Sequence, residues 1–218
     1  MKKLLISLLF CASLAVSVFS ATLLTDRQAL QEELIRLHVV ADSDSPEDQR
    51  RKLQVRDAVL RAIGDGMKQA GDAQAAKAYL LENLPEIQTA ARDCLQALGC
   101  QDGVSVTLCR EDFPRRLYDT FALPAGIYEA LRITIGKGEG HNWWCVAFPS
   151  LCVPAVSGDV ETAANAAGLP DSLTGAMTGR YRLRFYLLDL LGSWETGRSQ
   201  EKPSLQFLPI SGTITGNY

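Results

Sequence analysis

The sequence predicts an α+β domain in which helices pack on a mostly antiparallel sheet, preceded by an N-terminal signal segment. An alternating apolar segment at residues 34–41 comes before a helical region at 46–99, and the hydrophobic period then changes to two for a run of strands. A strand, then helices, then consecutive strands is typical of this class. The 47% hydrophobic content of 218 residues suffices for one domain with a proper core.

The chain begins with the layout of a secretory signal. Lys2 and Lys3 precede an uncharged apolar run from Leu4 to Phe19, and the small residue Ser20 offers a cleavage site. We therefore expect export, with residues 1–20 either removed as a signal peptide or kept as a membrane anchor. Removal would delete two lysines and no acid and change the net charge from −3 to −5. With that charge, no nucleic acid partner is expected.

A strand is expected over residues 34–41, and the helix after it has a clear start signal. Ser45 stands at the N-cap, Pro46 is the first helical residue, and acids fill the first turn. A second helical region begins at Asp72 and is broken or kinked at Pro85. Both helical regions carry apolar residues at helical spacing, so each should bury one side.

Three more strands are expected after residue 103. Residues 104–109 alternate between apolar and polar, a proline and glycine turn lies at 123–126, and residues 131–135 alternate again. Residues 143–148 are apolar and aromatic and form the last strand. The glycine loop 136–140 joins the last two strands.

The composition changes beyond residue 154, which closes the α+β domain at residues 21–154. Residues 155–179 are rich in Ala, Gly, Ser and Thr and are expected to be a linker. Residues 180–198 are basic and then apolar, and fit a strand in their first half and an amphipathic helix in their second. That segment either packs on its own domain, the favoured reading, or docks on a partner or a membrane surface. Residues 199–218 are expected to be disordered.

The chain has six cysteines, of which five follow residue 20. An odd number in an oxidising compartment leaves at least one thiol free or paired with another chain. Cys145 and Cys152 either close a small disulfide loop or are two buried thiols. With no CxxC pair and two histidines, no metal is expected. No cofactor is expected either, since no helix follows the glycines of residues 136–140 as a phosphate-binding loop requires.

Rare residues are concentrated in residues 136–152, GKGEGHNWWCVAFPSLC, which hold one of two histidines, two of three tryptophans and two of six cysteines. Loops with such residues are where binding usually occurs. His141 lies four residues before Cys145, and an imidazole close to a thiol would activate it for catalysis. A strand starting at residue 143 would separate the two side chains, so no catalytic residue is assigned.

A second candidate site includes His38, which lies on the alternating first strand. A histidine in such a place is more often a hydrogen-bonded core residue than a catalyst. With Asp42 and Arg132 it could nevertheless form a polar site at one end of the sheet. That grouping depends on how the strands pair.

Four long motifs follow one another along the sequence: IRLHVVADSDSPEDQ, LQVRDAVL, LPAGIYEALRITIGKGEGHNWWCVAFPSLC and RYRLRFYLLDLLGSW. In this order they closely resemble the stage II sporulation protein R family of endospore-forming bacteria. The resemblance covers residues 34–154, with a looser match at 180–194. Asp42 stands where the family commonly has asparagine, and Ala147 and Ser150 vary inside the last part of the third motif.

The resemblance implies a signalling protein that is made in the forespore and exported into the space between forespore and mother cell. Proteins of this family trigger a membrane-embedded aspartic protease there, which matures the precursor of the early mother-cell sigma factor. Contact rather than catalysis is implied, and a secreted hydrolase or thiol enzyme acting on cell wall or protein is the alternative. The residues that match the family motifs are candidate partner-contact or structural positions: His38, Ser43, Asp44, Arg56, Asp57, Arg132, Gly138, Gly140, His141, Asn142, Trp143, Trp144, Cys145 and Cys152.

Overall fold

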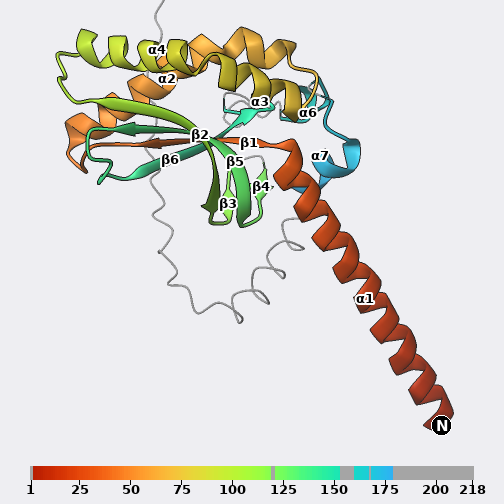
Figure 1. Ribbon diagram of the computed structural model, residues 1–218. Helices are drawn as coiled ribbons and strands as arrows, with labels where there is room; N and C mark the ends of the chain where they lie inside the picture. Colours follow the sequence, from red (N-terminus) through yellow and green to blue (C-terminus); the bar gives the residue numbers. More distant parts are fainter. Residues whose placement is uncertain (1, 119–120, 153–159, 167, 179–218) are drawn as a thin grey trace, which may run out of the picture.

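The computed structural model describes residues 2–118, 121–152, 160–166 and 168–178 (Figure 1). The expectations for residues 180–198 and 199–218 lie outside these ranges. In chain order the elements are α1 (Lys2–Glu33), β1 (Ile35–Val40), α2 (Pro46–Gln69), α3 (Ala73–Glu82), α4 (Leu84–Ala97), β2 (Val104–Phe113), β3 (Arg116–Leu117), β4 (Ala122–Leu123), β5 (Gly126–Ile135), β6 (Asn142–Phe148), α6 (Val160–Ala166) and α7 (Asp171–Thr178).

Four strands form the main sheet in the order β2-β5-β1-β6. β5 is antiparallel to β2 and parallel to β1, and β1 is antiparallel to β6. The predicted class, an α+β domain with a mostly antiparallel sheet, is confirmed. Every residue of the central strand β1 is buried. β5 begins at Gly126, inside the expected turn, because that residue still pairs with Phe113 at the end of β2.

Helices α2 and α4 cover one face of the sheet (Figure 1). α2 begins as predicted: the Ser45 hydroxyl accepts a hydrogen bond from the Asp48 amide at 3.1 Å, which satisfies a free donor of the first turn. Its buried stripe packs into the core between the helices and the sheet. α3 ends at Glu82 and α4 begins at Leu84, so the second helical region breaks as predicted beside Pro85, which lies in the first turn of α4. The residues of α2 in this stripe are Val55, Val59, Ile63 and Met67.

The other face of the sheet is covered at one end by a second core. Leu30 at the end of α1, Phe121 next to β4 and residues of α6 and α7 meet there around Tyr128 of β5. The expected linker is therefore wrong for the described residues 160–166 and 171–178, which form helices. Their composition misled the prediction because small residues also suit short helices that pack closely. Buried residues of these helices include Val160, Ala164, Leu173 and Met177.

α1 is one continuous helix that projects away from the domain (Figure 1). Its apolar residues from Leu4 to Val18 are mostly exposed, whereas Leu30 is fully buried in the second core. By length and composition α1 could cross a membrane, a test that a secretory signal near the N-terminus also passes. The apolar helix is therefore compatible with the predicted signal segment.

Candidate functional site

The loop between β5 and β6 packs directly on the turn between β1 and α2. The Gly140 amide donates to the Ala41 carbonyl at 3.0 Å, and the Glu139 amide donates to the Asp42 carbonyl at 3.1 Å. A Cβ on Gly140 would lie 2.3 Å from the Ser43 carbonyl oxygen, so this approach requires glycine. Gly138 has φ +68°, where glycine is favoured, and turns the loop back.

Two aspartates of the β1–α2 turn fasten this loop. Asp42 accepts a hydrogen bond from the Lys137 amide at 2.6 Å. Asp44 accepts one from the His141 amide at 2.6 Å and also pairs with the His141 ring Nδ1. These hydrogen bonds lower the pKa of the Asp44 carboxyl, the ring contact most. Lys52 of α2 is buried, which lowers the pKa of its ammonium, and donates to the His141 carbonyl at 2.9 Å.

Ser43 supports the start of α2. Its hydroxyl and that of Ser45 both donate to Oδ2 of Asp48, at 2.5 and 2.8 Å. The Ser43 bond is the larger cause of the lowered pKa of the Asp48 carboxyl. Ser43 thus holds together the turn on which the glycine loop rests.

Trp143 at the start of β6 packs on α2. The Arg56 guanidinium lies 4.4 Å from the centre of the Trp143 ring, and Asp57 pairs with Arg56 at 2.7 Å. The Trp143 residue is 36% exposed, so the ring is both held and accessible. These residues and the fastened loop form one surface, which we term the loop surface: Asp44, Arg56, Asp57, Lys137, His141 and Trp143.

A second group of polar residues lies on the other face of the sheet. The His38 ring meets Glu111 through Nδ1 at 2.9 Å and the Asn142 side-chain oxygen through Nε2 at 2.8 Å. Arg132 donates to the same Glu111 carboxylate at 3.1 Å. Trp144 stacks on the His38 ring at 5.6 Å. We term His38, Glu111, Arg132 and Asn142 the His38 cluster.

Of the three residues His38, Asp42 and Arg132, which were expected to form one polar site, the structure brings together His38 and Arg132, through Glu111. Asp42 lies apart from them and binds the Lys137 amide of the glycine loop. Glu111 carries no local signal in the sequence, because its neighbours depend on the antiparallel register of β2 on β5, which pairs Thr107 with Arg132. Lys52 was missed too, although a lysine among the apolar positions of a helix is a detectable signal.

Cys145 and Cys152 form a disulfide. Of the two alternatives left open by the sequence, the structure takes the bonded one. Cys145 therefore carries no thiol in this state, and the ring of His141 is engaged by Asp44. Burial raises the pKa of the other thiols in the domain, which keeps them protonated and unreactive: Cys94, Cys100 and Cys109.

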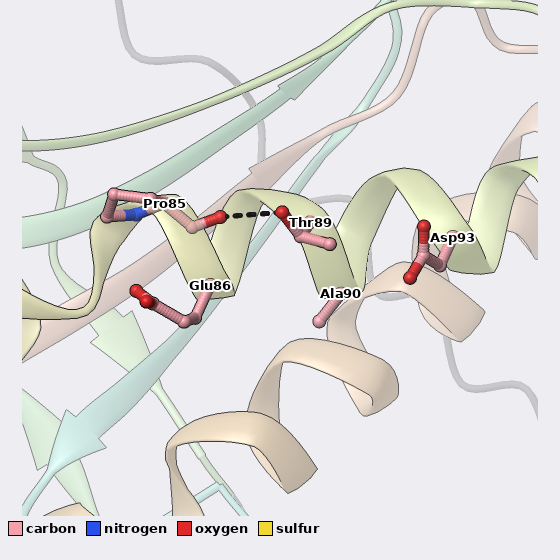
Figure 2. Close-up of a pocket in the computed structure, with 5 residues that line it drawn as sticks. All are labelled: Pro85, Glu86, Thr89, Ala90 and Asp93. Carbon is pink, nitrogen blue, oxygen red and sulfur yellow. Dashed lines mark hydrogen bonds between the residues drawn. The ribbon is translucent and has the colours of Figure 1, made fainter.

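Two hollows of the surface lie away from both sites. One hollow, of about 360 Å³, lies on α4 and is lined by Pro85, Glu86, Thr89, Ala90 and Asp93. Figure 2 shows how these five side chains lie along the helix. A second, of about 500 Å³, lies where the end of α1 meets α3 and β5, beside the Lys77–Glu129 ion pair. Neither is lined by a candidate residue. Within the described residues, no three His, Cys, Asp or Glu side chains are grouped so that they could hold a metal ion.

Comparison with known proteins gave two matches. The family model of stage II sporulation protein R matches residues 31–157. The stage II sporulation protein R of Bacillus subtilis (strain 168) is 40% identical over 123 residues, which are 56% of this chain and 55% of that protein. The match therefore spans about half the length of that relative. No solved structure matches.

Proposed function

Because the chain belongs to the stage II sporulation protein R family, we propose that it is an exported sporulation signal that activates a membrane-embedded aspartic protease by direct contact. Membership supports a role in sporulation. The protease would then mature the precursor of the early mother-cell sigma factor. The site of action would be the space between forespore and mother cell, which the chain would reach through the apolar part of α1.

The observation that carries the contact mechanism is the construction of the loop surface. Backbone hydrogen bonds join its two loops, and Asp44 and Lys52 hold the His141 segment from both sides. A surface that is rigid before binding loses little conformational entropy when a partner docks. Trp143, stacked on Arg56 but still exposed, is the kind of aromatic anchor that contributes most to such interfaces.

The geometry favours contact over the alternative of a secreted hydrolase or thiol enzyme. A nucleophilic Cys145 is not available in the disulfide-bonded state. His38 is buried, and both of its ring nitrogens are engaged by Glu111 and Asn142. A general base needs a free nitrogen within reach of a substrate proton. These two features support structural roles for the groups that an enzyme would have used.

Co-expression in a non-sporulating host tests the proposal. This chain, the membrane protease and the sigma-factor precursor are produced together, and precursor cleavage is scored by immunoblot. Cleavage should require this chain, should fall strongly with Trp143→Ala and Arg56→Ala, and should survive Glu86→Gln on the outer side of α4. Cleavage that is the same with and without this chain would refute the activating role.

Cys145→Ser separates contact from thiol chemistry in the same assay. A contact mechanism predicts that any loss of cleavage follows the loss of folded protein, because the disulfide stabilises β6 and the segment after it. Abolished cleavage by a variant that is fully folded and exported would favour the thiol enzyme instead.

A further inference from the structure

One half of the second sheet face lies beyond most of the second core, and Arg116 of β3 reaches over its edge, 3.5 Å from the centre of the Trp144 ring. Strand register places two rows of side chains there. We term these two rows the open half-face: Ser105, Thr134, Val40 and Asn142 in the first, and Thr107, Arg132, His38 and Trp144 in the second. The next row contains Arg36 and Ala130, which lie under the second core.

The open half-face is accessible at its β2 and β6 edges and at Arg132, whereas Val40 and His38 at its centre are buried. Ser105 and Thr107 are exposed, and Thr134, Asn142 and Trp144 are half-buried. The Arg132 side chain is 41% exposed. The second core, by contrast, buries Tyr128 and Phe113 at the other end of the same face. The rows therefore form a partly accessible polar surface with one half-buried aromatic ring and one half-exposed cation.

Arg132 is the one arginine of the two rows, and the Glu111 carboxylate pairs with it at 3.1 Å. The His38 ring meets the same carboxylate through Nδ1 at 2.9 Å. No residue of the two rows is acidic. The Glu111 carboxylate accepts a hydrogen bond from Nη1 of Arg132, and Nε of Arg132 donates to the Thr134 hydroxyl at 3.4 Å. A guanidinium has five N–H donors, so Arg132 can donate to a further acceptor.

Arg36, in the next row of the same face, supplies an excess of positive charge. It is fully buried, with Nε bonded to the Cys145 carbonyl at 3.0 Å and Nη2 to the Tyr118 hydroxyl at 3.0 Å, but Nη1 has no hydrogen-bond partner. The described residues place no carboxylate on it. Arg36 lies two residues from His38 along β1, about 7 Å away. A buried charge is poorly screened, so its potential reaches the open half-face.

We propose that the open half-face is a docking surface for an acidic segment of the partner protein, with a carboxylate of that segment on Arg132. The excess of positive charge on an otherwise acidic protein selects such a segment. Trp144 and Trp143 are neighbours on the edge strand β6 and lie on opposite faces. A partner that also covers the loop surface would therefore enclose β6 from both sides. The identity of the partner rests on the proposed function, whereas the acidic chemistry is tested without it.

The binding test uses the full chain, purified in a non-ionic detergent, and dye-labelled hexaglutamate and hexaglutamine peptides. Fluorescence anisotropy should detect binding of hexaglutamate alone, with an affinity that falls as salt is added. Arg132→Gln should weaken binding about tenfold. Lys68→Gln, which removes the same charge from an exposed site on α2, should change it less than about twofold.

Arg36→Met tests the buried charge. Replacing a buried cation by an apolar side chain of similar volume should leave the urea midpoint unchanged or higher. Binding of hexaglutamate should nevertheless weaken about threefold, because the added potential is lost. A folded Arg36→Met variant that binds as the wild type does would refute this part of the inference.

The outcomes separate the inference from the proposed function. No binding of hexaglutamate by the wild type, or equal losses in Arg132→Gln and Lys68→Gln, would overturn the acidic docking surface. Normal precursor cleavage with Arg132→Gln in the co-expression assay would overturn it too and leave the proposed function standing. Binding that depends on Arg132, in a chain that supports no cleavage, would keep the docking surface and refute the proposed function.

Discussion

Asp44 binds both the backbone amide and the ring of His141, 97 residues further along the chain. This contact ties the glycine loop to the turn before α2, and the loop surface depends on it. Because the contact uses an ionised carboxylate, its contribution to stability depends on pH.

The first prediction concerns acid stability. The pKa values of Asp44 and Asp48 are lowered in the folded state, so both carboxylates stabilise the fold at neutral pH. That stability is complete above the unfolded aspartate pKa of about 4 and is lost as the pH falls through the lowered folded values. The urea midpoint should therefore drop below about pH 4, and Asp44→Asn should reduce the drop. Asp65→Asn, at an exposed side chain of α2, serves as the control.

The second prediction concerns glycine packing. Gly140→Ala places a Cβ against the Ser43 backbone and should destabilise the domain by about 2 kcal/mol, since backbone must move. Gly64→Ala is the matched control, because its Cβ meets nothing within 4 Å inside α2. It should stabilise by up to about 1 kcal/mol. Chemical denaturation measures the free energy of unfolding of both variants. An equal change in the two variants would contradict the close contact between Gly140 and Ser43.

The third prediction concerns the disulfide between Cys145 and Cys152. Its loop is short, with a sequence separation of 7. Replacing both residues with serine should lower the free energy of unfolding by about 2 kcal/mol, chiefly by freeing the unfolded chain. Thiol titration of the denatured wild type should count two fewer free thiols than its cysteines before reduction. If all its cysteines titrate in the exported protein, the bond is absent.

The fourth prediction separates the two tryptophans. Trp144 stacks on His38 and lies under Arg116, so Trp144→Ala should cost about 2–3 kcal/mol of stability. Trp143→Ala loses a half-exposed ring and one cation–π contact and should cost about 1 kcal/mol. The Trp143 variant should stay folded and lose precursor cleavage. Normal cleavage by that variant would exclude Trp143 as an anchor.

Local signals in the sequence predicted local structure well. The start of α2 follows from Ser45 and Pro46, and the break at Pro85 follows from the chemistry of proline. Contacts between distant segments were not predictable in the same way. Glu111 joins His38 across 73 residues only because β2 takes one particular register on β5. A shift of that register by one residue would turn the carboxylate to the helical face.

Composition gave a wrong prediction for the segment around α6 and α7, whose structure depends on packing. The segment around α6 and α7 has the small residues of a linker, yet the second core requires these residues to fill it. Arg36 was not singled out either, because it stands at an alternating position of a strand that is buried on both faces. The candidate residues of the glycine loop were found because their types are rare in this chain, and rarity does not depend on the fold.

The continuity of α1 bears on how far the protein can travel. If residues 1–20 stay in a membrane, the rest of the helix is a rigid spacer that continues to Leu30 in the second core. The ten residues from 20 to 30 span about 15 Å, so an anchored domain would stay close to the lipid surface and diffuse in two dimensions. Cleavage after Ser20 would leave the packing of Leu30 in place and let the domain diffuse in three dimensions, so that one peptide bond would set how far the domain moves from the membrane.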